Sequence, residues 1–235
     1  MQTNEFLDKK QENFINFGYN TFVMVKVFQY DENQKEFSSN TYVIGKIGGT
    51  CLIIDLGSTS DEVYSYIESH YEKVEAVLLT HAHFDHIRGI PNFLKHYKNK
   101  SIPVYLAQED KLLLTSPEMN SSNLTGEKVA IKVDTIPVED GEVLPFKTGK
   151  VKVIKTPFHT EGSVCYLMDD DNCIFTGDTL FKGAIGRYDC ATSDPDKIAS
   201  SLGKLKELRD WLVVYPGHGP KTNIITEKNS NPYLK

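Results

Sequence analysis

Short apolar segments alternate with turn-forming residues along most of this 235-residue chain. Three early segments are rich in β-branched and aromatic residues and are separated by turn signals, so they predict a meander of strands: 21–28, 41–46 and 51–55. Residues 60–71 then bring a serine N-cap, an acidic first turn and apolar residues at helical spacing. We therefore expect a helix that packs on this first sheet.

The same order of strands followed by helices returns in the rest of the chain. Further strands are predicted at 76–80, 103–106, 127–133, 151–154, 163–168 and 173–176, and helices at 89–97, 108–115 and 195–209. Two such halves predict two sheets packed face to face with helices outside, which is an α/β fold of the four-layer αβ/βα sandwich type. No repeat or low-complexity linker divides the chain, so we expect a polar N-terminal segment over 1–20 and one domain over 21–235.

Side chains that bind metals are concentrated just past the predicted strands. One short segment and three single positions hold them: His81, His83, Asp85 and His86, then His159, Asp178 and His218. Neutral imidazole and carboxylate are ligands that zinc, iron and manganese accept. Because loops at one edge of a sheet can converge, this set predicts a two-metal site.

The two acidic residues of the set, Asp85 and Asp178, determine the net charge of the predicted site. Two divalent cations repel each other, so an anionic ligand between them is needed to hold the pair. Two such cations together with Asp85, Asp178 and a hydroxide leave about one positive charge, which can polarise a carbonyl and receive an anionic leaving group. Asp85 and Asp178 are therefore candidate catalytic residues.

Composition and charge narrow the classes of partner. Hydrophobic residues make up 40% of the chain and charged residues 25%, which is ordinary for a globular protein. Lys and Arg number 26 against 32 for Asp and Glu, a net charge of −6, so no nucleic-acid partner is expected. Neither a signal peptide nor an apolar run of about 20 residues is visible, which predicts a cytoplasmic protein without a membrane partner.

In their order along the chain, the candidate ligands resemble those of the metallo-β-lactamase superfamily, beginning with the motif His-x-His-x-Asp-His at 81–86. The resemblance extends over 55–219. It implies one metal held by His81, His83 and His159, another held by Asp85, His86 and His218, and Asp178 as a bridge. It also implies that Asp55 supports the metal loop as a hydrogen-bond acceptor, whereas the alternative from the residues alone is a carboxylate that caps its own turn before Gly57.

Within that superfamily, segments 156–162 and 177–181 and the pair Gly186-Arg187 resemble the glyoxalase II (hydroxyacylglutathione hydrolase) branch. This implies hydrolysis of a small acyl thioester, S-lactoylglutathione or a related glutathione conjugate, through a metal-bound hydroxide. Two divalent ions are implied, zinc with iron and manganese as alternatives. A thiol with a pKa of about 8.5 leaves as its anion, whereas an amine would need a proton donor that the sequence does not show.

The chain also departs from the glyoxalase II pattern. His218 is followed by Gly219 and Pro220, and only 17 residues come after it, so the chain resembles a short form without the C-terminal helical domain. Arg187 is the candidate substrate-binding residue for an anionic group, and its alternative is a salt bridge within its loop.

Other functions stay open at this point. An iron-dependent persulfide dioxygenase has the same fold with one metal, so the number of bound ions separates it from the hydrolase. A phosphodiesterase is disfavoured by the acidic balance of the chain. A non-catalytic binding protein with this fold is a further alternative, although such proteins usually lose ligands.

Overall fold

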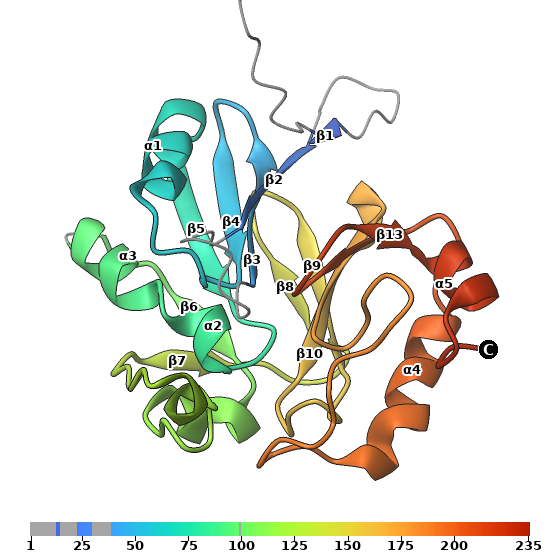
Figure 1. Cartoon of the computed structure of the whole chain (residues 1–235). Helices are drawn as coiled ribbons and strands as arrows, with labels where there is room; N and C mark the ends of the chain where they lie inside the picture. Colours follow the sequence, from blue (N-terminus) through green and yellow to red (C-terminus); the bar gives the residue numbers. More distant parts are fainter. Residues whose placement is uncertain (1–12, 15–22, 30–38, 99) are drawn as a thin grey trace, which may run out of the picture.

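Two sheets face each other in the computed structural model, which describes residues 13–14, 23–29, 39–98 and 100–235 (Figure 1). The first sheet has the strand order β1 (Asn13–Phe14), β2 (Val23–Gln29), β3 (Asn40–Lys46), β4 (Thr50–Ile54), β5 (Lys73–Leu78), β6 (Val104–Leu106) and β7 (Thr135–Pro137). The second has the order β13 (Thr222–Asn223), β12 (Val213–Pro216), β11 (Cys173–Gly177), β10 (Val164–Met168), β9 (Lys150–Lys155) and β8 (Val143–Pro145). Pairing is antiparallel from β1 to β4 and parallel from β4 to β7, while β11 and β12 form the parallel pair of the second sheet.

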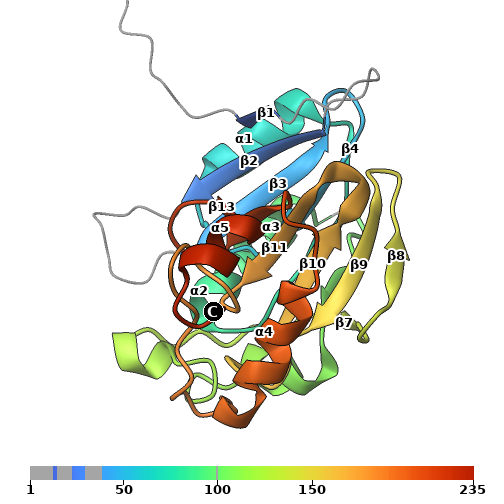
Figure 2. The same ribbon diagram turned by 90° about the vertical axis from the view of Figure 1, so that its right-hand side faces the viewer.

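Helices cover the outer faces of both sheets. The α-helices are α1 (Asp61–His70), α2 (Phe84–Ile87), α3 (Ile90–His96), α4 (Ile198–Lys206) and α5 (Ile224–Ser230). Shorter 3₁₀ turns are η1 (Gln108–Leu114), η2 (Ser122–Thr125), η3 (Asp169–Asp171) and η4 (Pro195–Lys197). Figure 1 shows α1 and α3 beside the first sheet, and Figure 2 shows α4 and α5 in front of the second.

Three apolar layers hold this arrangement together. The layer between the sheets contains side chains from both, such as Leu52, Leu78, Tyr166 and Phe175. A second layer packs α1 and α3 on the first sheet, and a third packs α4 and α5 on the second. The predicted four-layer αβ/βα sandwich is therefore confirmed.

Most predicted elements are present with shifted ends, but one strand is not. Residues 127–133 were expected to form a strand, and the structure has none there, so that prediction is wrong. Ile131 is buried, and its N–H donates to Leu114 O at 2.6 Å, so the apolar residues of this segment pack on η1 without joining a sheet.

Two of the predicted helices differ from the structure in type or extent. The helix expected over 108–115 is the 3₁₀ turn η1, and the one expected over 195–209 begins as η4 and continues as α4 to Lys206. Helix α5 was not predicted because only Ile224 and Glu227 of its seven residues are buried, which leaves little periodic signal. The first two residues of the strand expected over 21–28, and most of the predicted N-terminal segment, lie outside the described residues.

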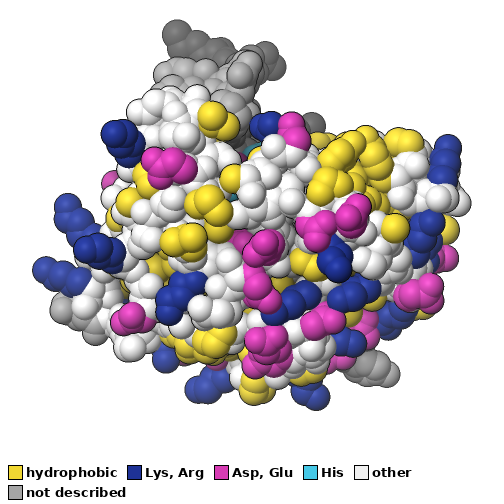
Figure 3. Space-filling view, turned by 90° about the horizontal axis from the view of Figure 1, so that it is seen from below, with side chains coloured by type: hydrophobic (Ala, Val, Ile, Leu, Met, Phe, Trp, Pro, Cys, Tyr) yellow, Lys and Arg dark blue, Asp and Glu magenta, His cyan; other side chains and the backbone are white. Residues whose placement is uncertain are grey.

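None of the described helices is long and apolar enough to span a membrane. On the lower face of the molecule, basic and acidic side chains are interspersed and only traces of histidine are visible (Figure 3).

Candidate metal centre

All seven predicted side chains come together where strands from both sheets end. The turn after β5 supplies His81 and His83, and the single-turn helix α2 supplies Asp85 and His86. The loops after β9, β11 and β12 supply the other three: His159, Asp178 and His218.

Three histidines form one compact group. The ligand nitrogens of His81, His83 and His159 all lie within 4.8 Å of one another. His83 Nδ1 is 2.8 Å from His159 Nε2, and all three rings are buried. Three imidazoles in this arrangement form a donor set that suits a divalent ion.

A second group contains Asp85, His86 and His218. His218 Nε2 lies 3.2 Å from Asp85 Oδ2 and 3.4 Å from His86 Nε2. The His86 side chain is fully buried, whereas that of His218 is 31% exposed. The centre therefore meets solvent beside His218.

Asp178 lies between the two groups. Its Oδ2 is 3.4 Å from both His159 Nε2 and His218 Nε2, and its Oδ1 is 3.3 Å from His86 Nε2. The carboxylate thus reaches nitrogens of both groups, which is the position that a bridging ligand needs.

Asp55 contacts the ring nitrogen of His86 that faces away from the other candidate ligands. Its Oδ2 is 2.8 Å from His86 Nδ1 and accepts from Thr80 Oγ1 at 2.8 Å, while its Oδ1 accepts from Thr80 N at 2.7 Å. Asp55 has a left-handed φ of 52°, which aspartate tolerates better than most residues. An acceptor at Nδ1 keeps the proton there and leaves Nε2 free as a ligand atom.

The same logic applies to two other histidines. His159 Nδ1 lies 2.7 Å from Arg187 O, and His81 Nδ1 lies 3.1 Å from Thr80 Oγ1, whose own proton goes to Asp55. In both rings Nε2 is the nitrogen turned toward the centre. Protein acceptors therefore select the tautomers that a metal would require.

Buried polar atoms without hydrogen-bond partners test whether a cation fits. His81 Nε2 and Asp178 Oδ1 are two such atoms at the centre. Leaving a buried polar atom unsatisfied costs about 1–3 kcal/mol. His81 and Asp178 belong, with His86, to one group of residues whose ligand atoms lie within 4.8 Å of one another, so the donor set fits a divalent metal.

Burial keeps the three-histidine group uncharged. It lowers the pKa of His81 well below the usual value and, together with neighbouring His159, lowers the pKa of His83 to about 3. Burial also lowers the pKa of His159. Neutral imidazoles are the form that coordinates metals.

The second group instead attracts positive charge. Burial opposes ionisation, yet His86 and His218 outweigh it and lower the pKa of Asp85 to about 2. Neighbouring carboxylates overcome burial in turn and raise the pKa of His86 to about 10 and that of His218 to about 11. A divalent cation would replace these protons, because the negative charge that raises both pKa values also favours the metal.

Gly217 keeps the centre closely packed. A Cβ at this position would lie 2.1 Å from Asp178 Oδ1 and 2.8 Å from His86 Cε1. Only glycine allows the main chain to pass this close to both side chains.

The Arg187 side chain does not reach the centre. Its guanidinium pairs with Asp189, with Nε–Oδ1 at 2.7 Å and Nη2–Oδ2 at 3.1 Å, and the side chain is 57% exposed. Its carbonyl oxygen is the atom that contacts His159. Substrate binding by Arg187 stays a prediction.

Two buried supports were not predicted. Asn40 Nδ2 donates to Pro216 O and Gly219 O, both at 3.0 Å, on either side of His218. Asp110 accepts from the loops that hold the three-histidine group. One signal existed for Asp110, since it lies three and four residues before two leucines on the buried side of a predicted helix.

The chain belongs to the metallo-β-lactamase superfamily. The family model of that description matches residues 35–218, which include all seven side chains of the centre. The predicted resemblance is thereby confirmed, and the protein is a metallo-hydrolase of this superfamily with a site for divalent metal.

Curated relatives cover most of the chain. "Probable metallo-hydrolase YqgX" of Bacillus subtilis is 37% identical over 189 residues, covering 78% of this chain and 87% of that protein. Hydroxyacylglutathione hydrolase GloC of Haemophilus influenzae is 31% identical over 201 residues, covering 84% of this chain and 93% of that protein.

Solved structures match at similar identity. The BLEG-1 B3 metallo-β-lactamase has a TM-score of 0.81 at 31% identity and covers 90% of this chain and 100% of its own. A protein crystallised in a di-iron-bound form has a TM-score of 0.74 at 28% identity and covers 89% of this chain and 100% of its own.

Proposed function

We propose that this metallo-hydrolase cleaves small acyl thioesters, with S-lactoylglutathione or a related acylated glutathione as its substrate. The observation that carries the proposal is the position of Asp178, whose carboxylate lies within 3.4 Å of nitrogens from both donor groups. The similarity to hydroxyacylglutathione hydrolase GloC supports the choice of thioester.

Two divalent ions would be held by the two groups. His81, His83 and His159 would hold one ion, and the other would be held by Asp85, His86 and His218, with Asp178 shared. The match to a protein crystallised with two irons supports this number. Zinc, iron and manganese all accept such nitrogen and oxygen donors.

Bound ions would polarise a carbonyl oxygen and lower the pKa of a water molecule. The chain itself supplies orientation and shielding. Asp55 and Thr80 fix the ring of His86, and the carbonyl of Arg187 fixes that of His159. Since His218 is the most exposed of the site histidines, a substrate would approach beside it, where the Phe181 ring packs edge-on at 5.8 Å.

The leaving group favours a thioester over an amide. A thiol has a pKa of about 8.5, so its anion departs without prior protonation, whereas an amine must receive a proton as it leaves. The imidazoles and carboxylates of this centre would all bind metal, so none of them would be free to protonate an amine. The centre therefore suits a substrate whose leaving group is a thiolate.

Hydrolysis of β-lactams is the second candidate, because the BLEG-1 B3 metallo-β-lactamase matches this chain at 31% identity and a TM-score of 0.81. The purified protein, loaded in turn with zinc, iron and manganese, is assayed on S-lactoylglutathione, on an acyl thioester without glutathione and on a chromogenic cephalosporin. We expect kcat/KM for S-lactoylglutathione to be the highest. Cleavage of the cephalosporin without cleavage of either thioester would contradict the proposal and support hydrolysis of β-lactams.

The same preparations test the dioxygenase alternative. Elemental analysis counts the metal, and an oxygen electrode follows reaction with glutathione persulfide. Two ions per chain and hydrolysis without oxygen uptake support the thioesterase. One iron per chain with oxygen uptake contradicts it.

A further inference from the structure

Asp110 joins two loops of the candidate centre through one buried carboxylate. Its Oδ2 accepts from Ala82 N at 3.0 Å and from Thr160 Oγ1 at 2.8 Å, and its Oδ1 accepts from Gly162 N at 2.8 Å. The residue is fully buried in the 3₁₀ turn η1. Three donors from two separate loops thus converge on one side chain.

The loops that Asp110 joins carry one half of the centre. Ala82 lies between His81 and His83, and Thr160 directly follows His159. Within the described part of the chain, the Asp110 carboxylate accepts from these two loops, whereas Asp55 and Asn40 support the loops of His86 and His218. We propose that Asp110 is a positioning residue that holds the three-histidine group in its metal-binding geometry. This inference rests on the proposed function, because it takes those histidines as ligands.

A carboxylate matches the three donors at this position better than an amide does. Two main-chain N–H groups and one hydroxyl approach Asp110, and a carboxylate can accept from all three. An asparagine offers one acceptor oxygen and one NH₂ group, so at least one N–H would face another donor. Thr160 is fixed further by Ser163 Oγ at 2.8 Å, and a Cβ on Gly162 would lie 2.6 Å from Asp110 Cγ, so the contact has little room to adjust.

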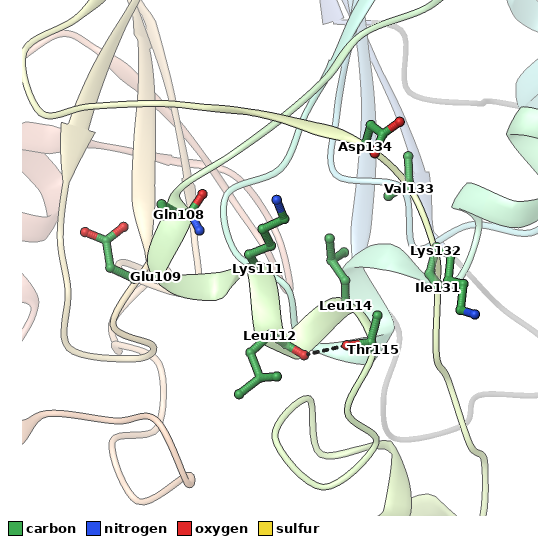
Figure 4. Close-up of a pocket in the computed structure, with 10 residues that line it drawn as sticks. All are labelled: Gln108, Glu109, Lys111, Leu112, Leu114, Thr115, Ile131, Lys132, Val133 and Asp134. Atoms are coloured by element: carbon green, nitrogen blue, oxygen red, sulfur yellow. Dashed lines mark hydrogen bonds between the residues drawn. The ribbon is translucent and has the colours of Figure 1, made fainter.

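The opposite side of η1 faces a separate hollow of about 730 Å³ (Figure 4). The sequence neighbours of Asp110 line this hollow together with the 131–134 segment, and none of its lining residues is one of the seven candidate ligands. Asp110 is therefore buried on the inner side of η1 together with Leu113 and Leu114, and its carboxylate contacts the metal loops, while Glu109 and Lys111 are exposed.

The test is the near-isosteric variant Asp110→Asn, titrated with zinc against a chromogenic chelator. We expect one of the two ions to bind about 10- to 100-fold more weakly, as is usual when the support of a ligand is lost, and the other to change by less than about 3-fold. Hydrogen–deuterium exchange at the Ala82 and Gly162 amides, measured without metal, should become faster.

Glu75→Gln is the matched control. Glu75 also accepts from two main-chain N–H groups, those of Lys147 and Thr148, and from the hydroxyls of Thr50 and Thr148, but it lies near the start of β5 and joins loops without candidate ligands. We expect both zinc affinities of this variant to stay at the wild-type level. If they fall as in Asp110→Asn, Asp110 contributes general stability only and the proposal is wrong.

Thr160→Val provides a milder change in case Asp110→Asn does not fold, because it removes the hydroxyl that bonds to Asp110 Oδ2 and Ser163 Oγ and leaves the carboxylate with its two main-chain donors. One ion should bind about 3- to 10-fold more weakly to this variant, a smaller loss of affinity than the one expected for Asp110→Asn. Unchanged affinity for both ions in the folded variants overturns the inference and leaves the proposed function intact. A wild-type protein that binds no metal overturns both.

Discussion

The substitution Asp178→Asn tests the shared ligand directly. Burial opposes the charge of Asp178, but His218, His86 and His159 hold its pKa well below the usual value, so the carboxylate is ionised at neutral pH. Asparagine keeps the shape of the side chain and removes its full negative charge. The change therefore isolates the electrostatic role of Asp178 between the two donor groups.

The expected effect follows from the burial of Asp178. Its side chain is 11% exposed and lies 3.3–3.4 Å from three histidine nitrogens. Removing one partner of such a buried charged set costs about 3–5 kcal/mol. At about 1.4 kcal/mol for each tenfold change, the second ion should bind about 100- to 5,000-fold more weakly.

Elemental analysis after dialysis against a zinc buffer measures this loss. We expect bound zinc to fall toward one ion per chain and kcat/KM for thioester hydrolysis to fall at least about 100-fold. His96→Ala is the control, since His96 is 36% exposed and contacts Glu68 at 2.8 Å, and it should keep the metal content. Two ions of wild-type affinity in Asp178→Asn would refute the shared position.

Four further outcomes are expected. Gly217→Ala should displace the Asp178 carboxylate, because its Cβ would lie 2.1 Å from Oδ1, and elemental analysis should show less than wild-type metal. Asp55→Asn should weaken zinc binding about 10- to 100-fold in chelator competition by releasing His86, and an unchanged affinity would mean that other contacts hold the ring. Chelation of the metal should lower the Tm by about 5–10 °C if binding at 100 times Kd contributes about 2.7 kcal/mol, and a calorimetric scan that shows no shift contradicts a metal that joins both sheets. Burial raises the pKa of Asp110 from 3.8 to about 6, so its contribution to stability is present below about pH 4 and is lost as the pH rises through 6. Two pKa units correspond to about 3 kcal/mol. Between pH 4 and pH 7, the free energy of unfolding of the metal-free wild type, measured in urea, should therefore fall by about 3 kcal/mol more than that of Asp110→Asn.

The parts of the centre that the sequence predicted share one property. Each candidate ligand lies in the loop or single-turn helix that comes after a β segment, and strand ends are where such folds gather their loops, so a local pattern was enough to place all seven together. Asp55 could be singled out for a similar reason, since it ends an apolar strand.

The supports that were missed depend on partners far away in the sequence. Asp110 bonds to Ala82, 28 residues earlier, and Asn40 bonds to Pro216, 176 residues later. No periodicity records such contacts, because they exist only once both sheets have packed. The strand prediction for 127–133 was wrong for a related reason. The alternating apolar residues of this segment pack on η1, and this packing produces the same apolar–polar alternation in the sequence as a strand does.

The division of the donor set between two sheets has a consequence for how the protein is made. His86 and His218 are 132 residues apart, so at about 5–20 residues per second the first four donors leave the ribosome many seconds before the last. During that interval the emerging chain offers three imidazoles and one carboxylate as an open chelator, which copper would bind more tightly than zinc or iron. The complete donor set, and with it the geometry that can discriminate between ions, exists only after synthesis has passed His218.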